Sequence, residues 1–129
     1  MRKDRSYGFT LVEILIIVGI IALLSAIAVP NILKAKISAN DVMAQATLKS
    51  IANSYENYMT INGEYPPTTG LLVGATPPYL NKDYFTGQHA GFTYASSGDS
   101  YSYAVSAVPI DLGRTGTTTY TITTGALFQ

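Results

Sequence analysis

Residues 8–33 read GFTLVEILIIVGIIALLSAIAVPNIL, and this stretch decides how the chain is built. From residue 14 onward it carries no charge, and Ile, Leu, Val and Ala dominate it. A helix needs about 20 such residues to cross the hydrocarbon core of a bilayer. The stretch therefore predicts an apolar helix near the amino terminus that is long enough to anchor the chain in a membrane.

Three basic residues, Arg2, Lys3 and Arg5, precede the apolar stretch. Because the basic flank of a membrane helix stays in the cytoplasm, this asymmetry places the amino terminus inside and the remainder of the chain outside. The predicted location is the cytoplasmic (inner) membrane, with a single crossing.

A secretory signal peptide is an alternative interpretation of the same stretch. Ala26-Ile27-Ala28 has the small-x-small form that precedes a signal-peptidase site. Cleavage after Ala28 would release a secreted binding module that starts at Val29. A permanently anchored sensor or adhesin is a third interpretation.

Glu13 distinguishes this stretch from an ordinary anchor or signal peptide. A charged side chain in hydrocarbon costs about 2.5–3.5 kcal/mol on insertion scales, so it predicts a function and a cationic partner. No lysine or arginine follows until Lys34, beyond the far end of the apolar stretch. The cation must therefore come from elsewhere. The simpler alternative is that Glu13 marks a helix end and snorkels to the membrane surface.

The basic leader, the segment GFTLVE at residues 8–13 and the apolar run together resemble the processing site of type IV prepilins and pseudopilins. The resemblance implies that a prepilin peptidase cuts after Gly8 and methylates the new amine of Phe9. A free α-amine has a pKa of about 8 and is therefore charged at neutral pH. The resemblance further implies that Glu13 pairs with this amine, within one chain or between subunits, and so sets the register of a filament.

Pro30 lies inside the predicted helix, where it removes one backbone hydrogen bond, and we expect a kink there. Beyond Pro30 an apolar stripe at helical spacing predicts a face that packs on a core, and Asn62-Gly63 should end the helix. The stripe consists of Ala44, Leu48, Ile51, Tyr55, Tyr58 and Met59, and the polar face includes Asn40, Gln45, Asn53 and Asn57.

Residues 64–90 are rich in proline and glycine and predict a structured loop. Residues 91–94 and 101–108 alternate with period two around a Ser-Ser-Gly-Asp turn at 96–99, which indicates a hairpin. Residues 118–124, TTYTITT, predict a third strand. The predicted fold class is α+β and type IV pilin-like: a long N-terminal helix, kinked at Pro30, packed on a small antiparallel sheet of three or four strands.

We divide the predicted chain into three ranges. Residues 1–8 are a leader that is removed, and residues 9–33 are the transmembrane and filament-core half of the helix. Residues 34–129 form an exported globular head that includes the amphipathic half of the helix.

Composition argues against several other functions. The chain has no cysteine, which excludes disulfides and thiol chemistry. Its one histidine, His89, is expected at the surface and belongs to no catalytic motif, and Asp99 and Asp111 are too few for a calcium loop. Removal of the leader leaves five basic and seven acidic residues, too little positive charge to attract nucleic acid. We predict no enzyme activity, cofactor, metal or nucleic-acid partner.

The predicted function is that of a structural subunit of a type IV pilus-like filament, polymerised through the N-terminal helix and located outside the cell or in the periplasm. A pseudopilin of a type II secretion system is the alternative within the same class, and the missing calcium-loop signature favours the pilus. The resemblance implies the partners: copies of this chain and other pilins, the prepilin peptidase, and an assembly platform with its ATPase machinery.

Overall fold

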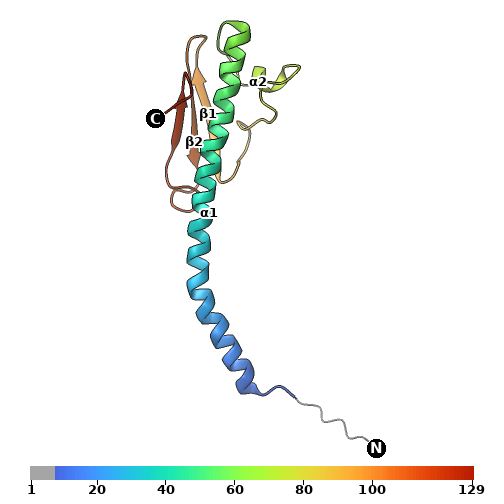
Figure 1. Ribbon diagram of the computed structural model, residues 1–129, viewed down its shortest axis with the longest axis vertical. Coiled ribbons are helices and arrows are strands. Elements are labelled where there is room, and N and C mark those ends of the chain that lie inside the picture. The colour runs from blue at the N-terminus through green and yellow to red at the C-terminus, as the bar shows by residue number, and fades with distance from the viewer. Residues whose placement is uncertain (1–7) are drawn as a thin grey trace, which may run out of the picture. The chain divides into compact units, whose positions relative to one another are not determined.

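The computed structural model describes residues 8–129, so that all of the predicted leader except Gly8 lies outside the described residues. The chain consists of two compact units with their boundary between Lys34 and Ala35, and the helix α1 contributes to both. The roles assigned to residues 9–33 and 34–129 stay predictions. The elements are α1 (Leu11–Asn62), α2 (Gly70–Gly74), β1 (Phe92–Gly98), β2 (Tyr103–Pro109), β3 (Tyr120–Thr123) and β4 (Leu127–Phe128), as Figure 1 shows.

The first unit is the amino-terminal part of α1, and every residue from 8 to 36 is exposed in the isolated chain. Among the described residues, α1 is the one helix that is long and apolar enough to cross a membrane. The helix continues through Pro30 without a break. Pro30 has no N–H to donate, and one residue later the side-chain amide of Asn31 donates to the carbonyl of Ile27 at 3.1 Å. The kink at Pro30 stays a prediction.

The second unit combines the remainder of α1 with an antiparallel sheet in the strand order β1-β2-β3-β4. Figure 1 shows this part of α1 running along the strands. The predicted helix stripe is buried at Ala44, Leu48, Ile51 and Tyr55, and half-buried at Tyr58 and Met59. The sheet contributes Phe92, Tyr94, Tyr103, Val105, Ala107 and Ile122 to the same core. The predicted α+β fold class is confirmed.

The end of α1 and the loop that follows it also agree with the predictions made from the sequence. Gly63 has a φ of 79°, a left-handed conformation that glycine adopts without steric cost, and its N–H donates to the carbonyl of Met59. The loop of residues 64–90 packs back on the core through the buried side chains of Leu72 and Leu80. The five-residue helix α2 lies within this loop and has no clear signal in the sequence.

Two predicted positions in the second unit are wrong. The hairpin turn lies at residues 99–102 and not at 96–99, because the carboxylate of Asp99 accepts the N–H groups of Tyr101 and Ser102, which makes Asp99 the first residue of the turn. His89 is half-buried, not a surface residue: its backbone exchanges two hydrogen bonds with Phe92, and its ring packs edge-on against Tyr84.

Asn40 is a third correction. The sequence placed it on the polar face of the helix that points to water or to neighbouring subunits. In the structure Asn40 is half-buried, and its side-chain amide donates to the carbonyl of Thr115 at 2.9 Å. The contact joins two positions 75 residues apart, which helical spacing alone does not reveal.

Glu56 connects α1 to three other segments of the second unit. Its carboxylate accepts the hydroxyls of Tyr103 at 2.9 Å and of Tyr65 at 3.1 Å, and the N–H of Gly125 at 2.9 Å. Hydrogen bonds to an ionised acceptor are roughly twice as strong as neutral ones. Glu56 thus joins the helix to the loop after it, to the start of β2 and to the β3–β4 turn.

The tyrosines that donate to Glu56 predict that the second unit loses stability at high pH. Burial raises the pKa of Tyr103 and of Tyr65, and the neighbouring Glu56 carboxylate raises both pKa values further. This contribution to stability is fully present below the ordinary tyrosine pKa of about 10, and is lost as the pH rises through the higher pKa of the folded state. We expect the urea midpoint of the full chain in micelles to fall between about pH 10 and about pH 12.

The matched control for this prediction is Tyr103→Phe, which keeps the ring and removes the titrating hydroxyl. The fall in the midpoint over the same pH interval should be smaller in this variant than in the unmodified chain. An equal fall in both proteins would show that Tyr103 does not contribute to the pH dependence.

Candidate functional site

The amino-terminal end of α1 holds Glu13 in a capping box. The helix begins at Leu11, which makes Thr10 the residue that caps it. The Thr10 hydroxyl accepts the N–H of Glu13 at 3.2 Å, and one Glu13 carboxylate oxygen, Oε2, accepts both the N–H and the hydroxyl of Thr10 at 2.8 Å. Such reciprocal bonds satisfy backbone groups that the first turn of a helix leaves unpaired.

The capping box changes the expected relation between Phe9 and Glu13. Pairing within one chain is one of the two predicted arrangements, because residues four apart share a face of a helix. In the uncleaved chain Phe9 precedes the helix and is 76% exposed, while Thr10 is the residue bonded to the Glu13 carboxylate. Both bonds that Thr10 donates to this carboxylate end on Oε2, and none of residues 8–129 donates to the second oxygen, Oε1.

Thr10 is a residue whose role the sequence reasoning missed. The spacing Thr-x-x-Glu before an apolar run is a known signature of a capping box and is present at residues 10–13. This spacing gives Glu13 a capping role in addition to its charge. Thr10 gives the first turn of α1 a fixed start and orients the carboxylate.

The capping box predicts a measurable effect of Thr10→Ala. The variant loses the hydroxyl that accepts the N–H of Glu13 and donates to its carboxylate, and loss of a capping side chain costs about 1 kcal/mol. We expect amide hydrogen exchange in the first turn of α1 to be roughly fivefold faster, measured by NMR on the processed chain in micelles.

Thr10→Ser is the matched control, because serine keeps the hydroxyl and caps helices as well as threonine does. Exchange in the first turn should be close to that of the unmodified chain. If Thr10→Ala and Thr10→Ser exchange at the same rate, the capping box does not stabilise the start of the helix.

Asp41 is a second side chain whose role the sequence did not reveal. A single carboxylate on an amphipathic helix is ordinarily exposed to solvent, but Asp41 is only 7% exposed. Its carboxylate accepts the N–H of Thr117 at 2.9 Å and the Thr117 hydroxyl at 2.7 Å, which compensates for removing the charge from water. The contact ties α1 to the segment before β3, a structural role within the second unit.

The described residues offer little that could hold a metal ion. Among residues 8–129, no group of three or more His, Asp and Glu side chains lies close enough together to bind one. Asp111 forms an exposed ion pair with Arg114 at 3.2 Å, and Asp99 caps the hairpin turn. The expectation that the chain works without a metal or cofactor stays a prediction.

Comparison with known proteins agrees with the features of the amino terminus. Residues 3–29 match the family described as "Prokaryotic N-terminal methylation motif". The chain is 39% identical over 66 residues to the type IV wide pilus major component PilA4 of Thermus thermophilus, a match that covers 51% of this chain and 50% of that protein.

Type II secretion system proteins are also similar to this chain. Core protein G of Aeromonas hydrophila is 32% identical over 68 residues, covering 53% of this chain and 48% of the relative. Core protein G of Escherichia coli is 32% identical over 85 residues, a match that covers 63% of this chain and 59% of that protein. The chain thus spans about half the length of the curated relatives it matches.

These similarities confirm the resemblance to the type IV pilin and pseudopilin family that the sequence carries at its amino terminus. The chain has the N-terminal methylation motif, and its long helix on a four-stranded antiparallel sheet is consistent with the type IV pilin fold. The apolar helix and the motif fit membrane anchoring and an assembled filament.

Proposed function

We propose that this chain is a structural, non-enzymatic subunit of a type IV pilus-like filament. In this proposal a prepilin peptidase removes residues 1–8 on the cytoplasmic side and methylates the amine of Phe9. Before assembly the subunit is anchored in the inner membrane with its amino terminus in the cytoplasm. It then polymerises with other copies and other pilins on an assembly platform driven by an ATPase. The observation that carries the proposal is the position of Glu13: its carboxylate is held by Thr10 in a capping box at the start of an exposed apolar helix.

Glu13 is suited to set the register between subunits. The amine of Phe9 exists only after cleavage, and its positive charge matches the carboxylate oxygen Oε1 that Thr10 leaves unused. A buried charge without a partner is strongly unfavourable, so an incoming helix should be stable only at the depth where amine and carboxylate meet. Lipid contact is replaced by helix contact during assembly, and apolar burial therefore contributes little to the choice of register.

A pseudopilin of a type II secretion system is the second candidate. It is favoured by the similarity to core protein G in several bacteria, with identities near those of the pilins. The two candidates share the helix, the processing site and the Glu13 pairing. They differ in what the filament does for the cell.

Deletion of the gene distinguishes the two candidates. For a pilus subunit we expect surface filaments to disappear from sheared fractions and electron micrographs, while the proteins in the culture medium stay the same. For a pseudopilin we expect exported proteins to accumulate in the periplasm. A deletion strain with normal filaments and normal secretion would contradict both candidates.

A further inference from the structure

The loop between β2 and β3, residues 110–119, presents apolar side chains to water. Ile110 is 44% exposed and Leu112 is 68% exposed. The loop lies at the end of the sheet where α1 enters the second unit (Figure 1). Single exposed apolar residues are common on protein surfaces, so the surroundings of these two decide whether they form an interaction surface.

Hydrogen bonds hold this loop in one shape. The N–H of Arg114 donates to the carbonyl of Asp111 at 3.0 Å, and the N–H of Gly113 donates to the carbonyl of Gly116 at 2.8 Å. Leu112 lies between these bonds and does not fold back on the core. A loop that is already fixed loses little conformational entropy when it binds a partner.

A contact with α1 fixes the position of the loop along the helix. The side-chain amide of Asn40 donates to the carbonyl of Thr115 at 2.9 Å. Lys36 is exposed and lies one helical turn before Asn40, on the same face of α1. Side chains of a helix lean toward its amino-terminal end, so Lys36 extends away from Asn40 toward the point where the chain enters the unit. Lys36 and the loop therefore belong to one end of the second unit.

This end of the unit carries a net positive charge. The exposed charged residues of the loop and of the adjacent turn of α1 are Lys36, Arg114 and Asp111, two positive and one negative. Arg114 pairs with Asp111 at 3.2 Å, but its side chain is 82% exposed, and such an exposed pair holds only weakly in water. Both basic side chains are therefore accessible to an anionic partner.

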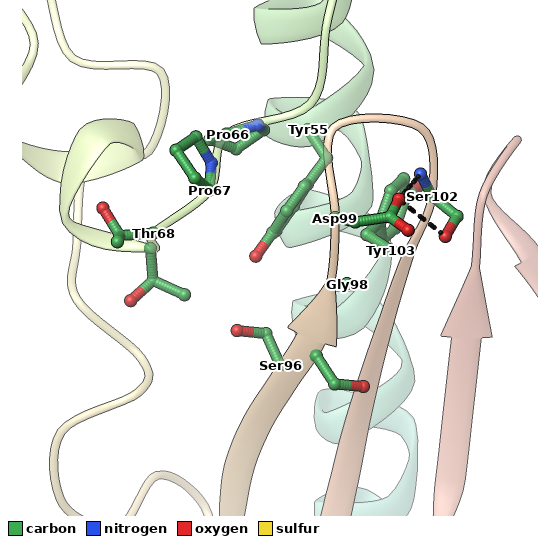
Figure 2. Close-up of a pocket in the computed structure, with 11 residues that line it drawn as sticks. Tyr55, Pro66, Pro67, Thr68, Ser96, Gly98, Asp99, Ser102 and Tyr103 are labelled. Carbon is green, nitrogen blue, oxygen red and sulfur yellow. Dashed lines mark hydrogen bonds between the residues drawn. The ribbon is translucent and has the colours of Figure 1, made fainter.

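The opposite end of the second unit is acidic. The exposed carboxylates of Glu64 and Asp99 lie there, and neither residues 62–66 nor the β1–β2 turn includes a basic residue. The N–H of Tyr65 donates to the carbonyl of Ser100 at 3.1 Å, which joins the segment after α1 to this turn. Figure 2 shows Asp99 at the turn. An anionic surface would thus attract one end of the unit and repel the other.

The position of Lys36 in the sequence indicates a lipid partner. The uncharged stretch that ends at Leu33 is long enough to span the hydrocarbon core of a bilayer. Lys36 follows Leu33 by three positions, so it lies in the headgroup layer when the stretch spans the membrane. In this layer apolar side chains enter the boundary between headgroups and acyl chains, and basic side chains are attracted to anionic headgroups. The loop beside Lys36 offers both kinds of side chain.

We propose that the β2–β3 loop docks on a lipid surface with anionic headgroups while the subunit is anchored in the membrane. Ile110 and Leu112 enter the boundary between headgroups and acyl chains, and Arg114 and Lys36 bind headgroup phosphates. The docking rests on the membrane-anchored state of the proposed function but requires no filament. It is released when the subunit leaves the membrane.

Tryptophan fluorescence tests the proposal, because the chain contains no tryptophan of its own. Leu112→Trp is reconstituted as the full chain in vesicles of equal parts phosphatidylglycerol and phosphatidylcholine, with and without brominated acyl chains that quench nearby tryptophan. We expect bromine to remove at least about half of its emission, because interfacial apolar side chains enter the acyl boundary. Tyr101→Trp is the control: Tyr101 is 87% exposed at the acidic end, and its substitute should lose little emission.

Charge variants combined with Leu112→Trp test the contact with headgroups. Lys36→Glu should lower the quenching, because one basic residue near an anionic surface strengthens binding roughly fivefold. Lys49→Glu is the matched control, since Lys49 is an exposed lysine farther along the same helix, and it should leave the quenching unchanged. Vesicles of phosphatidylcholine alone should quench Leu112→Trp less than the anionic vesicles do. Equal quenching in Lys36→Glu and Lys49→Glu would contradict the headgroup contact.

Flotation of the vesicles, measured in the same samples, separates this inference from the proposed function. A chain that does not float with the vesicles would contradict both, because it is not anchored. A chain that floats while Leu112→Trp is quenched no more than Tyr101→Trp would overturn the docking alone. If Leu112→Trp is shielded from water only in sheared filaments, the loop contacts another copy of the chain and the lipid proposal is wrong.

Discussion

Glu13→Ala is expected to prevent filament assembly while leaving cleavage after Gly8 intact. The proposed pairing places the charged amine of Phe9 against Glu13 of a neighbouring subunit in an apolar filament core. Removing one partner of a buried ion pair leaves an uncompensated charge and costs about 3–5 kcal/mol. This cost recurs at every subunit contact, so sheared filament, measured by immunoblot against the total processed subunit, should fall by more than tenfold.

Glu13→Gln separates the charge of Glu13 from its capping role. Glutamine at this position still accepts the Thr10 N–H in a capping box but carries no charge. If pairing with the amine sets the register, Glu13→Gln should fail to assemble as Glu13→Ala does. Filaments in normal amount from Glu13→Gln would reject the ion pair and assign the defect of Glu13→Ala to the helix start.

Phe92→Ala is expected to cause one of the largest losses of stability that a single change can cause in the second unit. Phe92 is fully buried at the start of β1, next to Tyr120, and its ring fills the space left by Gly116. Truncating a buried phenylalanine costs about 3–5 kcal/mol, the sum of lost burial and of the cavity that remains. The urea midpoint, followed by near-ultraviolet circular dichroism of the tyrosines, should fall accordingly.

Phe128→Ala is the matched control, because Phe128 is an aromatic residue of the same sheet but is 45% exposed. Its truncation should lower the midpoint much less than that of Phe92. A complementary change is Gly116→Ala: the added methyl carbon would overlap Cζ of Phe92 and should cost about 1–3 kcal/mol through overpacking. Equal midpoints for Phe92→Ala and Phe128→Ala would contradict the described core.

The sequence predicted those parts of the fold that depend on local pattern. The features that define α1 require no knowledge of any long-range contact: twenty uncharged, mostly apolar residues, the helical stripe from Ala44 to Met59, and the Asn62-Gly63 stop. Alternation with period two located β1 and β2, although the turn between them is three residues later than predicted. The pattern shows which residues alternate, whereas the position of the turn depends on which backbone groups the Asp99 side chain accepts.

The sequence could not predict contacts between residues that are far apart along the chain. Asp41 and Thr117 are 76 residues apart, and Glu56 and Gly125 are 69 apart. Each of these carboxylates occurs in a helical pattern where a solvent-exposed charge is the ordinary interpretation.

The candidate site was predicted in part. Gly8, Phe9 and Glu13 were recognised from the motif at the processing site, and their roles await experiment. Thr10 was readable from the Thr-x-x-Glu spacing, but its bonds to Glu13 became apparent only in the structure. One chain does not reveal a filament partner, because the proposed pairing joins two copies.

The intact mass and amino-terminal sequence of the native protein, taken from sheared surface material and from membranes, test the central claim most directly. A chain that starts at Phe9 with a methylated amine in sheared polymer is the predicted result, since it requires cleavage after Gly8, retention of the apolar helix and assembly. A chain that starts at Val29 in soluble material would contradict the claim, because the helix would then be a signal peptide that is lost before the protein acts.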